Sequence, residues 1–181
     1  MTPLPVRPVL RICSVAAADP AWRVAAIDAL SNQWHRPAVI SADIPFDPTG
    51  YYREEMGDDL VQQLIGFDAL IPPDGLPDWK LQTNRMETDL GSTFRSDRSR
   101  PVNLDCGYIT EAKFVLATTK NRSHRIYLRD GIFAEITLTY IAGRWQSNRQ
   151  TYPNYRTEAV AEFAVRCRKH LREGLQSMAA N

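Results

Sequence analysis

The chain has 181 residues, of which 44% are hydrophobic and 24% are charged, and its formal net charge at pH 7 is +1. This length and composition predict one globular domain with a substantial core, and the small net charge gives no overall attraction to nucleic acid or to a membrane surface. No apolar run approaches the roughly 20 residues that a membrane-spanning helix needs. Three cysteines without the spacing of a metal site favour a reduced, cytoplasmic setting.

Hydrophobic spacing and turn residues predict the elements of the first half of the chain. They are a buried strand over 9–15, a helix that begins at Asp19-Pro20, a strand over 38–46, a helix over 54–67 capped by Asp47 or Thr49, and a helix from Pro77 to about Leu90, where Gly91 is the expected stop. The expected core stripes are Val24, Ile27, Leu30 and Trp34 on the first helix and Met56, Leu60, Leu64 and Phe67 on the second.

The second half of the chain is richer in strands. A polar loop over 91–99 leads to a short strand over 101–104, a three-stranded meander from Lys113, a turn at 142–144 and a helix over 156–175 with Asn154 as its natural cap. We therefore predict an α+β fold, with a mainly antiparallel sheet, helices packed on one face, and a polar cleft on or at the end of the other. Residues 1–8 are expected to form a flexible lead-in, 9–176 a single α+β domain, and 177–181 a flexible tail.

The dipeptide Asp130-Gly131 predicts a hairpin within the meander. We expect a three-residue loop over 129–131, with Gly131 in the left-handed conformation that glycine adopts without penalty. The opposing pairs would then be Leu128–Ile132, Ile126–Ala134, His124–Ile136, Tyr127–Phe133 and Arg125–Glu135. Because directly opposed side chains touch, the last pair should form a cross-strand ion pair.

One face of the meander then gathers polar side chains, namely Thr118, Lys120, Arg125, Glu135 and Thr137. Tyr127 and Phe133 share this face, and an aromatic pair beside charges is costly to leave in water. The pattern favours a binding site. It also fits an ordinary solvated face of an antiparallel sheet, where opposite charges on neighbouring strands are common.

A second polar stripe lies on the third predicted helix, where Lys80, Asn84 and Glu87 share one face because they are spaced i, i+4, i+7. The strand that follows places Asn103 and Asp105 on its outward side. We expect the helix stripe to approach the polar face of the meander. The alternatives are a solvated Lys–Glu ladder on the helix and an edge strand blunted by charge.

Polar motifs in a fixed order connect these regions. They are Phe46-x-x-Thr49-x-Tyr51-Tyr52-x-x-Glu55-Met56-Gly57, Lys80-x-x-Thr83-Asn84-x-x-Glu87, Asn103-Leu104-Asp105-x-Gly107-Tyr108, Leu116-Ala117-Thr118-Thr119-Lys120, His124-Arg125-Ile126-Tyr127-Leu128, Gly131-Ile132-Phe133-Ala134-Glu135 and Thr151-Tyr152-Pro153-x-Tyr155. Together they resemble a bacterial family of unknown function, domain-of-unknown-function forty-four-sixteen. The resemblance spans most of the chain and implies a compact cytoplasmic protein without an established activity. The sequence departs from the family's usual pattern at Gly50, Cys106 and Asn154, where acidic residues or proline are commoner.

Some members of that family carry the label "GTP-binding protein". The chain lacks the Gly-rich loop ending in Gly-Lys-Ser/Thr with which such proteins cradle phosphates, so its residues do not support the label. Its three histidines are scattered and form no zinc motif, and no Gly-x-Ser-x-Gly elbow occurs. The basic run over 166–172 is most simply the solvent side of the last helix, so nucleic acid is not an expected partner.

Because the shared motifs are mostly polar, they indicate a site rather than a packing signature. The predicted ligand-binding residues are Lys80, Asn84, Arg100, Asn103, Thr118, Lys120, Arg125, Tyr127 and Thr137. Arg offers a bidentate fork and Lys a point charge to a phosphate or carboxylate. Glu87, Asp105 and Glu135 are the residues that would hold Mg²⁺, a hard cation that carboxylates and substrate phosphates bind.

The residues predicted for catalysis are Glu135, His124 and Lys120. His124 would act as acid or base, whereas its predicted place on the apolar side favours a core-edge histidine bonded to backbone. The first functional hypothesis is an enzyme or enzyme-like binder of a small anionic, phosphorylated molecule. The second is a non-catalytic module that binds a macromolecule through the aromatic and Arg face of the sheet.

Overall fold

A computed structural model of the chain describes residues 2, 5–46, 53–94 and 98–180. Within these residues a nine-stranded antiparallel sheet runs in the order β2-β4-β1-β5-β6-β8-β7, with β3 paired to β4 and β9 paired to β8. The strands are β1 (Val9–Ala17), β2 (Pro37–Ile40), β3 (Ile44–Pro45), β4 (Val61–Ile71), β5 (Asn103–Ile109), β6 (Lys113–Thr118), β7 (Ile126–Arg129), β8 (Ile132–Ile141) and β9 (Arg144–Ser147). The predicted α+β class with a mainly antiparallel sheet is confirmed.

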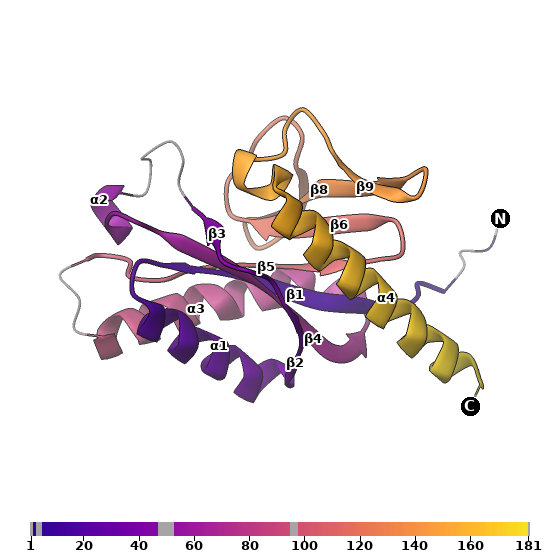
Figure 1. Cartoon of the computed structure of the whole chain (residues 1–181), viewed down its shortest axis with the longest axis horizontal. Coiled ribbons are helices and arrows are strands. Elements are labelled where there is room, and N and C mark those ends of the chain that lie inside the picture. Colours follow the sequence, from indigo (N-terminus) through magenta and orange to yellow (C-terminus); the bar gives the residue numbers. More distant parts are fainter. Residues whose placement is uncertain (1, 3–4, 47–52, 95–97, 181) are drawn as a thin grey trace.

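The helices lie on both faces of this sheet (Figure 1). They are α1 (Pro20–Trp34), α2 (Arg53–Met56), α3 (Leu76–Phe94) and α4 (Glu158–Ala180), with short 3₁₀ turns η1 (Pro73–Gly75) and η2 (Pro153–Arg156). The expectation of helices on one face holds for α1 and α3, whereas α4 covers the opposite face. Asp19 caps α1 as predicted, since its carboxylate accepts the Ala21 N–H at 2.8 Å.

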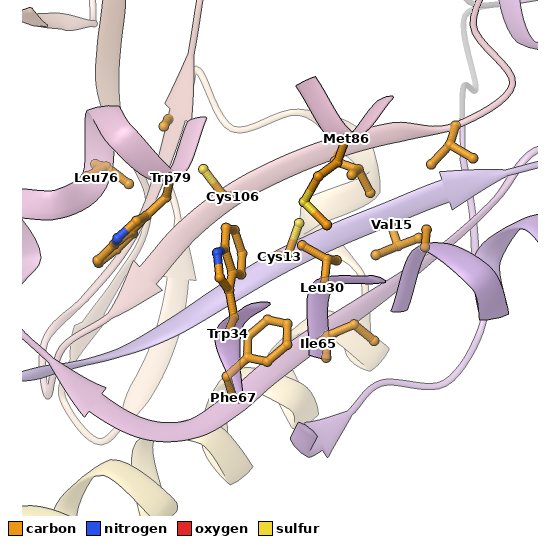
Figure 2. Packing of buried hydrophobic residues seen from close by; sticks show 14 of the residues in the cluster. Cys13, Val15, Leu30, Trp34, Ile65, Phe67, Leu76, Trp79, Met86 and Cys106 are labelled. Carbon is orange, nitrogen blue, oxygen red and sulfur yellow. The ribbon is translucent and has the colours of Figure 1, made fainter. Parts of the chain in front are cut away.

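The larger hydrophobic core lies between the sheet and the pair α1 and α3 (Figure 2). Trp34 of α1 packs edge-to-face on Phe67 of β4, with ring centroids 5.4 Å apart. Trp79 and Met86 of α3 close the core from the other side. Burying side chains of this size contributes about 1.5–3 kcal/mol each, so this layer fixes α3, and with it the polar side chains of α3, against the sheet.

A second core lies on the other face, under α4. The predicted inner stripe of that helix is confirmed, because Val160, Phe163, Cys167 and Leu171 are all buried. They pack against the residues of β1 and β4 that alternate with those of the first core, such as Ile12 and Leu64. The helix continues through Ala180, so residues 177–180, expected as a tail, are helical.

The predicted helix over 54–67 is wrong, because only Arg53–Met56 is helical and β4 follows from Val61. The four residues of its expected stripe are nevertheless all buried. Strand β4 is covered on both faces, so Leu64 faces α4 while Ile65 and Phe67 face α1, and the strand lacks the alternation of a half-buried one. A short apolar run of this kind has no period that separates strand from helix. The caps proposed at Asp47 or Thr49 lie outside the described residues.

The buried face of α1 and the end of α3 also differ from the prediction. On α1, Val24 is 59% exposed and Arg23 is buried in its place, because Nη1 of Arg23 donates to the Ala17 carbonyl at 3.1 Å. On α3, Gly91 does not end the helix. The helix continues to Phe94, whose ring stacks on Trp22 with centroids 5.3 Å apart, so a tertiary contact outweighs the low helix propensity of glycine.

The hairpin between β7 and β8 has a two-residue turn, not the predicted loop of three. Asp130 and Gly131 both have positive φ, and Arg129 lies opposite Ile132. The pairs Ile126–Ala134 and Tyr127–Phe133 are as predicted, because an irregularity between Tyr127 and Arg129 absorbs one residue. The predicted Leu128–Ile132 pair is therefore wrong, whereas the register that brings Arg125 to Glu135 is preserved.

Candidate functional site

The sheet divides between β5 and β6. These strands pair only where residues 107–109 of β5 meet 114–116 of β6, although β5 stays paired to β1 as far as Asn103 and β6 stays paired to β8 as far as Thr118. Gly107 stands where the two strands meet. A Cβ there would lie 2.0 Å from the Val115 carbonyl oxygen, so only glycine permits this approach.

A cavity of about 500 Å³ occupies the divergence, a volume in the ordinary range for small-molecule sites. The described residues that line it are Phe46, Lys80, Asn84, Glu87, Arg100, Asn103, Asp105, Leu116, Ala117, Thr118, Thr119, Lys120, Arg122, Arg125, Glu135, Tyr152, Pro153, Asn154 and Tyr155. The helix stripe and four of the five polar residues of the meander, Thr118, Lys120, Arg125 and Glu135, thus line one cavity, as the sequence predicts.

Side chains of α3 take the place of β6 along the free edge of β5. The backbone N–H of Leu104 donates to Oε1 of Glu87 at 2.6 Å, and its carbonyl accepts from Nζ of Lys80 at 2.7 Å. Both groups would otherwise be unpaired, at a cost of about 1–3 kcal/mol each. Lys80 and Glu87 therefore hold the divergence open while satisfying the strand edge.

Lys80 also forms an ion pair with Asp105, Nζ to Oδ1 at 3.0 Å, and Asn103 donates from Nδ2 to Oδ2 at 2.9 Å. Burial opposes ionisation of Asp105, but Lys80 and Asn103 outweigh it and hold the pKa of Asp105 below its ordinary value. Burial likewise opposes the charge of Lys80, and Asp105 with Glu87 raises the pKa of Lys80 above its ordinary value. Burial dominates at Glu87 and raises the pKa of that carboxyl, despite Lys80 nearby.

The wall formed by β6 and β8 is centred on Arg125. Its Nε donates to Oε2 of Glu135 at 2.6 Å and its Nη1 to the Lys120 carbonyl at 2.8 Å, and both side chains of the ion pair are under 7% exposed. The predicted ion pair is confirmed. His124 does not face Ile136, and among the described residues its side chain bonds no backbone group; its Nε2 lies 3.3 Å from the same Glu135 oxygen.

The turn η2 closes the cavity from the α4 side, and the sequence interpretation missed it. Tyr152, Pro153, Asn154 and Tyr155 line the cavity from this turn. Asn154 does not cap α4, because its Nδ2 donates to Oε1 of Gln62 on β4 at 2.6 Å. The shared Thr-Tyr-Pro-x-Tyr motif was the available signal, but it also fits a helix entry.

Two predicted binding residues lie elsewhere. Tyr127 is 59% exposed on the hairpin, where its ring meets that of Phe133 at 5.4 Å. Thr137 is buried within the sheet and does not line the cavity, because the strand irregularity opposite Phe114 and Val115 shifts the alternation of β8. The remaining predicted ligand-binding residues all line the cavity.

The predicted Mg²⁺ ligands do not form a metal centre by themselves. Among the described residues, no group of three or more His, Cys, Asp or Glu side chains is placed to hold a metal ion. The reason is that each carboxylate already has a protein partner: Glu87 the Leu104 amide, Asp105 Lys80, and Glu135 Arg125.

Residues 7–171 match the sequence model of the family described as Domain of unknown function (DUF4416). The chain belongs to this family. No curated protein and no solved structure matches it. None of the described helices is long and apolar enough to cross a membrane. A function for this DUF4416 protein is therefore inferred from its fold and from the residues that line the cavity.

Proposed function

We propose that this DUF4416 protein binds a small phosphorylated molecule in the cavity between β5 and β6. The observation that supports the proposal is the charge of the lining, where the described residues supply the five cations Lys80, Arg100, Lys120, Arg122 and Arg125 against three carboxylates. The side chains of Lys80 and Arg125 are buried, and cations in a concave site favour an anionic ligand of matching size.

Arg125 is the residue best prepared to bind the anion. Glu135 and the Lys120 carbonyl fix the guanidinium through Nε and Nη1, whereas Nη2 has no hydrogen bond within the described part of the chain. A guanidinium that is already oriented loses little side-chain entropy when it binds phosphate. Glu135 acts here as a positioning residue, so we propose binding and assign no reaction to Glu135, His124 or Lys120.

The three cysteines are buried and unpaired, which supports a reducing compartment such as the cytoplasm for this activity. The alternative function, binding of a macromolecule through the aromatic face, would use Tyr127 and Phe133, which lie outside the cavity. The two functions are therefore separable by mutation.

The test is a thermal-shift titration of the full chain with inorganic phosphate, methyl phosphate, sugar phosphates and nucleotides, each with and without Mg²⁺. A phosphate ester at about 100 times its Kd should stabilise the fold by about 2.7 kcal/mol and raise Tm by several degrees. Enhancement by Mg²⁺ would mean that the ligand phosphate completes a metal site with one of the carboxylates.

The matched variants are Arg125→Lys and Arg129→Lys. Arg129 is an Arg on the same hairpin that pairs with Asp130 and Asp78 outside the cavity, so its change is a control. Arg125→Lys should weaken the anion about tenfold, whereas Arg129→Lys should bind as the parent does. Absence of a shift with every anion would refute the proposal, and an equal shift in both variants would remove Arg125 from the site.

A further inference from the structure

We infer that the ligand is a sugar phosphate, with its phosphate on the β6–β8 wall and its hydroxyls on the wall formed by α3 and β5. This inference rests on the proposed function and adds the part of the ligand that is not the anion. It follows from the different chemistry of the two walls, which face each other because they belong to the two diverging strands.

The β6–β8 wall is cationic. Within the described residues it contributes Lys120, Arg122 and Arg125 against one carboxylate, Glu135, which Arg125 neutralises. Thr118 adds a hydroxyl beside them, and its Oγ1 accepts the Lys120 N–H at 3.2 Å. This wall is the one that a phosphate would contact.

The α3–β5 wall carries hydrogen-bond acceptors instead. Glu87 uses only Oε1 within the described residues, which leaves Oε2 open, and the side chain of Asp105 is 33% exposed beside the cavity. The side-chain amide of Asn84 has no partner in the described part of the chain although it lines the same space. Lys80 compensates Asp105, so these acceptors present little uncompensated negative charge.

Acceptors at a partly buried wall need donors, because an unpaired buried polar group is costly. A second phosphate there would meet the oxygens of Glu87 and Asp105, which accept hydrogen bonds and offer it no donor, and an apolar group would leave the acceptors unpaired. Hydroxyl groups satisfy them, since a hydroxyl donates to a carboxylate and also accepts from the amide of Asn84. A cavity of about 500 Å³ accommodates a pentose or hexose phosphate.

The test compares ligands by calorimetry on the full chain: methyl phosphate, ribose 5-phosphate, glucose 6-phosphate and adenosine monophosphate. At least one of the two sugar phosphates should bind about tenfold more tightly than methyl phosphate, the gain expected from a hydrogen bond to a charged group. Methyl phosphate that binds as tightly as both sugar phosphates would overturn the inference and leave the proposed function intact. No binding by any of the four would instead refute the proposed function, and this inference with it.

The matched variants are Asn84→Ala and Arg85→Ala, neighbours on α3 of which only Asn84 lines the cavity. Asn84→Ala should remove most of the preference for the sugar phosphate without changing the affinity for methyl phosphate. Arg85→Ala, at an exposed position, should keep both affinities. An unchanged preference in Asn84→Ala would contradict the inference, and so would tighter binding of adenosine monophosphate than of ribose 5-phosphate, because the base would then be recognised too.

Discussion

Lys80 and Asp105 form an ion pair of 3.0 Å although α3 packs on one face of the sheet and the side chain of Asp105 is directed toward the other. Lys80 lies on α3, whose apolar residues fill the first core, whereas Asp105 lies opposite Ser14 in the register that faces α4. The Lys80 side chain reaches Asp105 past the unpaired edge of β5, which β6 has left. This pair therefore exists only because the sheet divides.

The first prediction is that Lys80→Met destabilises the protein by about 3–5 kcal/mol, because it leaves Asp105 uncompensated and the Leu104 carbonyl unpaired. Urea unfolding measures the difference. The control is Lys169→Met on α4, whose side chain is 78% exposed and which should change stability by less than about 0.5 kcal/mol. Equal effects of the two substitutions would show that Lys80 is not a support of the cavity.

The second prediction is that replacing two glycines by alanine changes stability in opposite directions. Gly107→Ala would place Cβ 2.0 Å from the Val115 carbonyl oxygen and should cost at least about 3 kcal/mol, the upper end of overpacking. Gly91→Ala lies inside α3, where the nearest atom, on Pro101, is 3.4 Å away, and should stabilise by up to about 1 kcal/mol. Thermal unfolding of both variants tests the pair, and a tolerated alanine at 107 would mean that the strands meet differently.

The third prediction concerns the thiols. Burial raises the pKa of Cys106 to about 12, with Asp105 adding to the effect, and burial also raises the pKa of Cys13 and Cys167. Since the thiolate is the reactive form, none of the three should react with a disulfide reagent at pH 8 in the native protein, and all three should react in denaturant. Rapid reaction of one thiol under native conditions would place that cysteine outside the core.

The site was more predictable from sequence than some of the fold. Lys80, Asn84 and Glu87 lie at spacings that define one helix face, and Arg125 opposite Glu135 follows from local hairpin register, so local rules suffice for each part. That the two parts converge was supported only by the shared polar motifs. What local rules miss is the divergence of β5 from β6, because it depends on the close approach of Gly107 to the Val115 carbonyl of the neighbouring strand.

The predictions that were wrong or incomplete also depend on tertiary packing, which local sequence patterns do not report. The sequence predicts a helix over 54–67, which includes residues 61–67 of β4, because burial of β4 on both faces removes the period of two. The contribution of Tyr152 and Asn154 was missed because α4 carries the preceding turn over the cavity, a placement set by the second core. The aromatic pair of Tyr127 and Phe133 formed as predicted but outside the cavity, so a shared sheet face did not imply a shared site.

The last prediction is that Glu87 and Asp105 give stability opposite dependences on pH. The pKa of Glu87 is raised in the folded state, so its ionisation costs stability as pH rises from about 4.3, the ordinary value, through the raised one. Glu87→Gln keeps an acceptor for the Leu104 amide and should be more stable than the parent at pH 8, with the gain vanishing at acid pH.

The pKa of Asp105 is lowered, so its contribution is present above about 3.9 and is lost as pH falls through the folded-state value. Asp105→Asn should therefore be less stable than the parent at neutral pH, and the deficit should shrink below about pH 4. Urea unfolding of parent and variants between about pH 3.5 and pH 8 gives both differences. Because each variant is compared with the parent at the same pH, the pH-dependence that parent and variant share cancels in both differences. A Glu87→Gln variant that is no more stable than the parent at pH 8 would refute burial as the dominant influence on Glu87, and an Asp105→Asn variant that is no less stable would refute the lowered pKa of Asp105.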